Sequence, residues 1–233
     1  MTVSVIITSY NYGNFLHEAI DSVLQQTFNR KEFEVIVVND GSTDNTSKVA
    51  KKFQVTLLNQ KNLGLPIARN NGIKYSKGRF ILPLDADDKL HPQFLEKTVP
   101  ILENFPNIGV VYTHRKHFGL IQTTKYAGIY SLETLKKTCI LNYCSLFKKQ
   151  VWSECGGYNP NMKLGYEDWD FWLSIAQNNW DFKLVNEVLF YYRKHGFSLI
   201  DLAKENHYKL LRTIKSNHIK LFSEKRNSNL VQF

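Results

Sequence analysis

Cysteine and long apolar runs are both scarce in this sequence. Only three of the 233 residues are cysteine, and they form no Cys-x-x-Cys pair. An odd number of cysteines argues against a disulfide framework and indicates reduced thiols. The chain enters a strand-like run at Val3 without a basic leader or cleavage site, and no apolar run approaches the roughly 20 residues that cross a bilayer. We therefore expect a cytoplasmic protein without a membrane span.

Acidic residues are the minority among the charged ones. Lys and Arg number 30 against 21 Asp and Glu, for a formal net charge of +9. This excess favours anionic partners, namely phosphates, anionic lipid headgroups or nucleic acid, without choosing among them. Repeats and low-complexity segments are lacking too. Hydrophobic residues make up 43% of the chain, which is enough for the core of one large domain.

Strands and helices alternate in the first half of the chain. Apolar runs rich in β-branched residues predict buried strands over residues 3–8, 33–38, 55–58, 80–84 and 109–113. Apolar residues at helical spacing predict helices between them, the first capped by Asn14 and a later one begun by Pro66. This order predicts an α/β protein with an open, mostly parallel sheet and helices on both faces. Pro83, inside the fourth strand, predicts a bulge or an unpaired position.

The pattern loosens after about residue 115. We expect a helix over residues 167–178, short strands over 182–185 and 188–192, and a basic amphipathic helix over 202–222. The predicted units are residues 1–115, 116–200 and 201–233. The last helix either packs on the protein or lies on an anionic membrane surface. Its apolar stripe comprises Tyr208, Leu211, Ile214, His218 and Leu221.

Polar clusters follow three of the predicted parallel strands. They are residues 8–11, 39–42 and 85–88, and ligands bind at the carboxyl edge of such sheets. Asp85, Asp87 and Asp88 repel one another unless a cation neutralises them, and Mg²⁺ or Mn²⁺ prefers such oxygen ligands. The alternative is a solvated turn in which Asp88 caps the next helix.

Asp40 and Tyr10 suggest recognition of a pyrimidine. A carboxylate can accept the N3–H of uracil or thymine, and a tyrosine ring can stack on the base. The alternative for Asp40 is an ordinary Asp-Gly turn with Gly41.

In this order, the motifs resemble the inverting GT-A glycosyltransferases of family 2, whose sheet is Rossmann-like with a smaller mixed acceptor-side region. The matching segments are SVIITSYN (residues 4–11), VVNDGSTD (37–44), NLG (62–64) with ARN (68–70), LDADD (84–88), GYEDWDFW (165–172), and YYRKH (191–195) with Ser198.

The resemblance implies a role for each matching residue. Thr8, Tyr10 and Asp40 would hold the base, and Arg69 would reach the nucleotide or its phosphates rather than lie on a helix surface. Asp85 would bind the ribose side, with Ala86 in the same donor-binding segment. Asp87 and His195 would serve Mn²⁺ or Mg²⁺, although a lone histidine is more often structural.

Asp168 would be the catalytic base, with Glu167 beside it. Inversion requires a carboxylate that takes the proton of the attacking hydroxyl. The alternative for this pair is a plain helix start, where acidic residues suit the helix dipole. Trp169 and Trp172 would form a sugar-stacking wall, unless Trp172 belongs to the core.

The expected function is transfer of a sugar, with UDP-hexose as the default donor, to a glycan or lipid-linked acceptor. Residues 1–115 would bind the nucleotide sugar, residues 116–200 would bind the acceptor and carry out catalysis, and the tail would make any membrane contact, on the inner face. A nucleotidyltransferase is the competing enzyme, but it usually has a Gly-rich phosphate loop where this chain has residues 8–11. A silent nucleotide-sugar-binding module is the non-enzymatic alternative. Binding of nucleic acid would depend on charge alone and is not expected.

Overall fold

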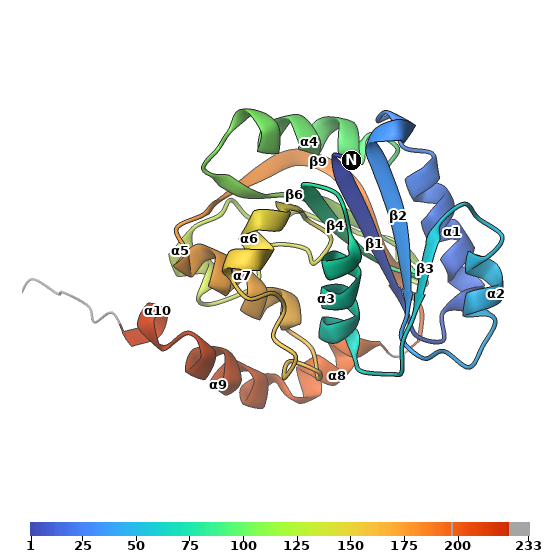
Figure 1. Ribbon diagram of the computed structural model, residues 1–233. Coiled ribbons are helices and arrows are strands. Elements are labelled where there is room, and N and C mark those ends of the chain that lie inside the picture. The colour runs from blue at the N-terminus through green and yellow to red at the C-terminus, as the bar shows by residue number, and fades with distance from the viewer. Residues whose placement is uncertain (197, 224–233) are drawn as a thin grey trace, which may run out of the picture.

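The computed structural model describes residues 1–196 and 198–223. Within them, one nine-stranded sheet has the order β3-β2-β1-β4-β8-β6-β9-β5, with β7 paired to β6 (Figure 1). The strands are β1 (Val3–Ser9), β2 (Phe33–Asn39), β3 (Thr56–Asn59), β4 (Phe80–Asp85), β5 (Lys89–Leu90), β6 (Ile108–Gly119), β7 (Thr124–Lys125), β8 (Leu146–Lys148) and β9 (Asp181–Lys194).

The first four long strands are parallel, as predicted. β1 pairs with both β2 and β4, so that Ser9 lies beside Asn39 and Thr8 beside Asp85. The polar clusters that follow these strands therefore meet at one edge of the sheet. The pairing of β1 with β4 runs through Pro83 without a bulge, and β8 pairs only with Phe80 and Ile81. The missing N–H of Pro83 consequently falls beyond the β8 ladder.

The second half of the sheet is mixed. β8 lies antiparallel between β4 and β6, whereas β6 and β9 run parallel over almost their full lengths. The two short strands predicted over 182–185 and 188–192 are parts of the single strand β9. The pairing register shifts where Thr113 faces Val185 and the next residue, His114, faces Val188. This shift interrupts the alternation of side chains along β9, which explains why the sequence pattern suggested two separate strands.

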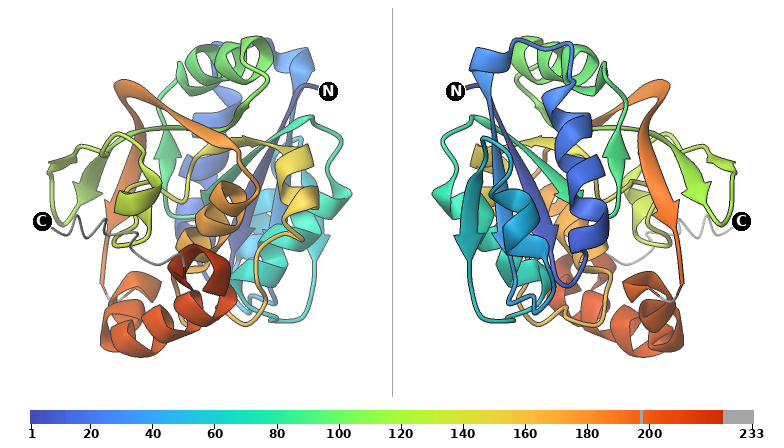
Figure 2. Two further views of the ribbon diagram at one scale, coloured as in Figure 1. Left: turned by 90° about the vertical axis from the view of Figure 1, so that its left-hand side faces the viewer. Right: turned by 90° about the vertical axis from the view of Figure 1, so that its right-hand side faces the viewer.

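Helices cover both faces of the sheet (Figure 2). Val5 and Ile7 of β1 pack toward one core and Ile6 toward the other, because side chains alternate along a strand. The first core involves α1 (Gly13–Leu24), α2 (Thr46–Ala50) and α4 (Phe94–Asn104). The second involves α3 (Leu65–Tyr75), α5 (Leu132–Leu135), α6 (Lys149–Glu154) and α7 (Glu167–Gln177). A 3₁₀ turn, η1 (Arg30–Glu32), precedes β2.

The first helix begins two residues earlier than predicted, with Tyr12 rather than Asn14 at the cap position. Asn14 lies within α1, and the carboxylate of Asp44 accepts the N–H of Gly13 at 2.8 Å. The same carboxylate accepts the N–H of Thr46 at 2.9 Å. One acidic side chain thus satisfies the starts of α1 and α2, and its charge suits both helix dipoles.

The tail forms three short helices instead of one. They are α8 (Leu199–Glu205), α9 (His207–Asn217) and α10 (Ile219–Ser223). Ser198 and Asp201 form a capping box that starts α8 before the predicted residue 202. The rest of the predicted tail, residues 224–233, lies outside the described part of the chain.

The apolar stripe of the tail packs on the protein. Ile214, Leu221 and His218 are buried, and His218 Nε2 lies 3.0 Å from the buried carboxylate of Asp170 in α7. Of the stripe, only Tyr208 is largely exposed, at 79%. Most of the apolar stripe that suggested a membrane contact therefore packs against the rest of the protein. In the ranges 1–196 and 198–223, no helix is long and apolar enough to cross a bilayer.

Candidate active site

Two adjoining cavities open at the carboxyl edge of the parallel strands. The small cavity has a volume of about 460 Å³ and is lined mainly by residues at or after the ends of β1, β2, β3 and β4, together with α8. The large cavity, of about 660 Å³, lies beside it and extends to α7, α8 and the β6–β7 hairpin. Both are bordered by Leu65, Asp85, Tyr192, Leu199 and Ile200. A ligand in one cavity would therefore meet a ligand in the other near Asp85.

Asp40 is fixed at the wall of the small cavity. Its carboxylate accepts hydrogen bonds from Gln60 Nε2 at 2.7 Å and from the N–H groups of Leu63 and Gly64 at 2.8 and 2.9 Å. Gly41 permits this arrangement, because its φ is +79° and a Cβ there would lie 2.6 Å from the nitrogen of Asn62. A carboxylate has about four acceptor positions, so three protein donors leave one for a ligand.

Tyr10 and Thr8 also line the small cavity. Tyr10 is 46% exposed, so its ring offers a stacking surface. Thr8 Oγ1 donates to Asp85 Oδ1 at 3.1 Å, and the N–H of Ala86 donates to the carbonyl of Thr8. Ala86 is buried, and its contribution is therefore through the backbone. The structure brings the residues predicted to hold the base and ribose to one cavity.

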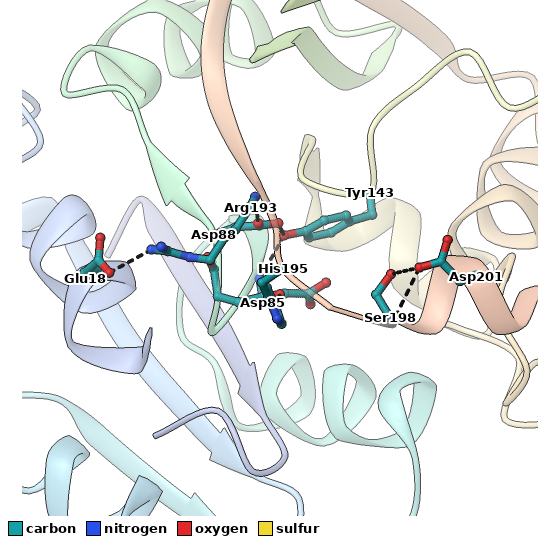
Figure 3. A network of polar contacts seen from close by, with 9 residues as sticks. Glu18, Asp85, Asp88, Tyr143, Arg193, His195, Ser198 and Asp201 are labelled. Carbon is teal, nitrogen blue, oxygen red and sulfur yellow. Dashed lines mark hydrogen bonds and ion pairs between the residues drawn. The ribbon is translucent and has the colours of Figure 1, made fainter. Parts of the chain in front are cut away.

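Asp88 is held inside the protein by hydrogen bonds to other residues. It is buried, accepts the hydroxyl of Tyr143 and accepts the N–H of Arg193 at 2.6 Å (Figure 3). The pKa of Asp88 is raised well above its usual range, by burial and by the charges of Asp87 and Asp85. The alternative in which Asp88 caps the following helix is wrong, because α4 begins only at Phe94.

Asp87 and His195 form a contact between the acidic loop and the end of β9. His195 Nε2 lies 2.9 Å from Asp87 Oδ2. The pKa of Asp87 is raised by burial and by the charge of Asp85. His195 packs against the rings of Tyr12 and Phe15, with centroid separations of 5.3 and 4.8 Å.

These two side chains suit a hard divalent cation that keeps other ligands. A carboxylate oxygen and an imidazole nitrogen are ordinary ligands of Mn²⁺, and the neighbouring carboxylates would stabilise its charge. No group of three or more His, Cys, Asp or Glu side chains within residues 1–196 and 198–223 is arranged to hold a metal ion. A cation on this pair would need further ligands from elsewhere, such as substrate phosphates.

Arg193 is a site residue to which the sequence assigned no role. Its Nε donates to the carbonyl of Asp87 at 2.7 Å, and its guanidinium pairs with Glu18 at 2.8 Å (Figure 3). The guanidinium also lies between the rings of Phe15 and Phe118. Arg193 thus fixes the backbone of the acidic loop. The only available signal was its place in the YYRKH segment.

Arg69 is enclosed in an ion-pair network. Its guanidinium is 1% exposed, donates to Glu167 Oε1 at 2.7 Å and donates to Asp85 Oδ1 at 3.0 Å. It lies over the rings of Tyr143 and Tyr158. The role expected from the sequence was contact with the nucleotide or its phosphates. The geometry instead favours a positioning role, in which Arg69 joins the donor side of the site to the acidic pair of α7.

The acidic pair begins α7, and its two members face different surroundings. Tyr166, just before the helix, has a left-handed φ of +58°. Gly165 has a φ of +117°, and a Cβ there would lie 2.5 Å from Cβ of Ala203, so α8 closes over this turn. A strained backbone of this kind is common where side chains must be aimed precisely.

Both acids border the large cavity, but Glu167 is buried and paired with Arg69, whereas Asp168 is less buried and has no ion pair in the described chain. Asp168 Oδ1 accepts the N–H of Trp169 at 2.8 Å, and in the described part of the chain Oδ2 has no protein partner. Burial raises the pKa of both acids, although the charge of Arg69 opposes this. Of the two acids, Asp168 is therefore the one that no cation of the described chain holds in an ion pair.

The suggested tryptophan wall is wrong. Trp172 is fully buried, and Trp169 is almost so, with its indole N–H donated to the carbonyl of Leu135 at 2.7 Å. Both rings belong to the core between α7 and the sheet, where a sugar cannot reach them.

The sequence matches the family model Glycosyl transferase family 2 over residues 4–158. A chondroitin synthase of Escherichia coli is 28% identical over 222 residues, which are 90% of this chain and 32% of that protein. The chain spans a third or less of the length of the first curated relatives it matches.

Solved structures share the fold. S. aureus TarS 1–349 in complex with UDP-GlcNAc superposes with a TM-score of 0.77 at 20% identity, over 93% of this chain and 66% of that one. A mannosyltransferase from Pyrobaculum calidifontis, PcManGT, in complex with GDP-Man and Mn²⁺, has a TM-score of 0.67 at 17% identity, over 96% of this chain and 65% of that one. The matched motifs, the sheet and the family model agree: this chain has the GT-A fold and belongs to glycosyltransferase family 2.

Proposed function

We propose that the chain is an inverting transferase that moves a hexose from UDP to a hydroxyl of a glycan or lipid-linked acceptor. The observation that carries this proposal is the position of Asp168, whose carboxylate borders the large cavity that adjoins the nucleotide-sized small cavity near Asp85. A base in this cavity can take a proton from an acceptor hydroxyl as that hydroxyl attacks the donor sugar.

The small cavity would hold the uridine. The remaining acceptor position of Asp40 suits the N3–H of uracil, Tyr10 would stack on the base, and Thr8 with Asp85 would contact the ribose side. The TarS structures with UDP and UDP-GlcNAc support this choice of nucleotide. Thymine presents the same N3–H, and the donor panel below distinguishes the two.

Asp87 and His195 would hold Mn²⁺ or Mg²⁺ together with the donor diphosphate. The Mn²⁺ in the PcManGT complex supports such a cation. When bound, the cation would offset the negative charge that grows on the departing diphosphate. Arg193 would keep the loop of Asp87 in place, through its bond to the carbonyl of that residue and its ion pair with Glu18.

The ion pairs of Arg69 favour Asp168 over Glu167 as the base. All three acids border the large cavity, but Arg69 forms ion pairs with Glu167 and Asp85 and leaves Asp168 without one in the described chain. In the resulting single displacement, the acceptor oxygen bonds to the anomeric carbon while the bond to the diphosphate breaks. The proton of the acceptor passes to Asp168.

The same geometry supports a division of labour along the chain. Residues 1–115 would bind the nucleotide sugar, because they supply most of the small cavity. Residues 116–200 would bind the acceptor and supply the base, because they form most of the large cavity. The proposed tail, residues 201–233, would close the site through α8 and anchor α7 through the contact of His218 with Asp170.

A panel of nucleotide sugars tests the donor assignment. Thermal stability would be measured with Mn²⁺ and UDP-, dTDP- or GDP-linked hexoses, and slow release of the nucleoside diphosphate would be followed for each. A ligand at 100 times its Kd stabilises the folded state by about 2.7 kcal/mol. We expect stabilisation and turnover with a UDP-sugar. Failure of every nucleotide sugar to bind would contradict the proposed function.

Removal of the cation, or of its carboxylate ligand, should abolish transfer. Asp87→Asn keeps the size of the side chain but removes the charge, and the fold should survive because Arg193 contacts the backbone of residue 87 rather than this carboxylate. Activity would be measured with Mn²⁺, with EDTA and after Mn²⁺ is restored. Glu103→Gln, at an exposed ion pair with Arg79, provides a matched control. Equal activity in EDTA and Mn²⁺ would show that no cation is needed.

A further inference from the structure

Three cations line the large cavity but not the small one. They are Arg115 of β6, Lys125 of β7 and Lys194 of β9. None of the three has an ion pair with an acidic residue within the described ranges 1–196 and 198–223. Lys204, a fourth cation of this wall, is already paired with Asp201 at 3.0 Å. The wall thus presents three positive charges that the described protein does not neutralise.

The strand register concentrates these charges. Arg115 lies directly opposite Lys125 in the β6–β7 pairing, and like charges at such positions destabilise a hairpin. His117, two residues after Arg115, borders the same cavity, and its pKa is lowered to about 4 by burial and by the charges of Arg115, Lys194 and Lys125. The sheet therefore retains an electrostatically unfavourable arrangement next to the proposed active site.

The acidic residues of the cavity offset this arrangement only in part, and in the described chain none of them forms an ion pair with the three cations. Asp85 and Glu167 are both engaged by Arg69, and Asp201 is engaged by Lys204 and Ser198. Asp168 is the acid left open, and it is the proposed base. An anion supplied by a ligand would complete the charge balance.

We propose that the large cavity binds an anionic group of the acceptor glycan, a carboxylate or a phosphate, between Arg115, Lys125 and Lys194. This inference rests on the proposed function, because the acceptor must lie where its hydroxyl can reach Asp168, and that residue borders the same cavity. The donor nucleotide is assigned to the small cavity, which none of the three cations lines. The basic wall therefore selects for acceptors that carry negative charge.

Matched pairs of small probes test this selection. Methyl β-glucuronide would be compared with methyl β-glucoside, and glycerol phosphate with glycerol, by NMR titration of protein saturated with UDP and Mn²⁺ at constant ionic strength. We expect the charged member of at least one pair to bind about tenfold more tightly, the effect of one or two charge-assisted hydrogen bonds. Equal binding within both pairs would overturn the proposal.

Variants of the β6–β7 hairpin test whether these cations cause the preference for charged probes. Lys125 is exposed and has no ion pair in the described chain, so Lys125→Gln should fold normally and lose most of the preference for the charged probe. Arg115→Gln should do the same, although it also loses a bond to Asn142. Lys116→Gln is the matched control. Lys116 follows Arg115 on β6 and is exposed, but it does not line the cavity. If Lys116→Gln lost the preference for the charged probe to the same extent, the preference would come from the overall positive charge of the protein and not from this cavity. That result would overturn the proposal.

Two donor measurements exclude the other sources of the anion. UDP affinity should be unchanged in Lys125→Gln, and a loss there would assign the cations to the diphosphate. The ratio of affinities for UDP-glucuronate and UDP-glucose should also be unchanged, and a change would place the carboxylate on the donor sugar. Either result would overturn the acceptor assignment. If the proposed function itself failed, UDP would not bind at all, a result that is distinct from the probe titrations.

Discussion

Asp168→Asn is expected to lower the rate of sugar transfer by about 10²- to 10⁴-fold, the usual contribution of a positioned general base. The variant keeps the size and polarity of the side chain and its acceptor oxygen for the N–H of Trp169, but it cannot take up the proton. Donor affinity should be nearly unchanged, because Asp168 does not line the small cavity. Turnover and UDP affinity, measured on the same preparations, check this result.

Glu167→Gln is the informative neighbour of this substitution. Glu167 is buried and paired with Arg69, although it also borders the large cavity. Its loss should therefore affect stability more than the chemical step. Near-normal turnover in Asp168→Asn would contradict the assignment of the base. A collapse of turnover in Glu167→Gln alone, with stability retained, would move the base to that residue.

The pH dependence should carry the same signature. Burial raises the pKa of Asp168, with Arg69 and Arg115 opposing the effect. The base must be deprotonated to act, so turnover should fall as the pH is lowered through this raised pKa. The loss should therefore begin at a higher pH than an exposed aspartate would give, and the acidic limb should vanish in Asp168→Asn.

Arg69→Met should cost about 3–5 kcal/mol of unfolding free energy, the range for removing one partner of a buried ion pair. The substitution leaves Glu167 buried without its cation and Asp85 without one of its two side-chain donors. It also removes a cation from between the rings of Tyr143 and Tyr158. Transfer should fall as well, because the network fixes the start of α7. Chemical denaturation followed by fluorescence checks the stability.

The double variant Arg69→Met with Glu167→Gln separates charge from packing. If an unpaired buried carboxylate causes most of the loss, neutralising Glu167 should recover part of it, and the two substitutions should be clearly non-additive. Lys97→Met, at a more exposed ion pair with Glu187, should change stability by no more than about 1 kcal/mol. A cost for Arg69→Met as small as that of the control would contradict the buried-network account.

The convergence of three polar clusters on one cavity was predictable from the sequence, because parallel strands bring their carboxyl ends together. Thr8, Asp40 and Asp85 follow three strands whose apolar runs are plain, and the register places these residues around one cavity. The start of α7 was predictable too, since acidic residues precede a clear apolar face.

Residues that act through long-range contacts were harder to predict. Arg69 resembles a surface arginine in the sequence, and only the packing of Tyr143, Tyr158 and Glu167 around it reveals its burial. Tyr143 lies in the region that matches no motif, although its hydroxyl contacts both Asp88 and the N–H of Asp85. The division of the tail into three helices likewise depends on contacts with the body of the protein, which helical periodicity does not encode.

The anomer released by slow donor hydrolysis tests the central claim most directly. Water can replace the acceptor beside Asp168, so no acceptor needs to be known. With an α-linked UDP-hexose at high enzyme concentration, proton NMR would record the sugar before it mutarotates. A single displacement aided by Asp168 predicts that the β-anomer appears first and that Asp168→Asn releases it far more slowly. Initial release of the α-anomer would contradict the inverting mechanism.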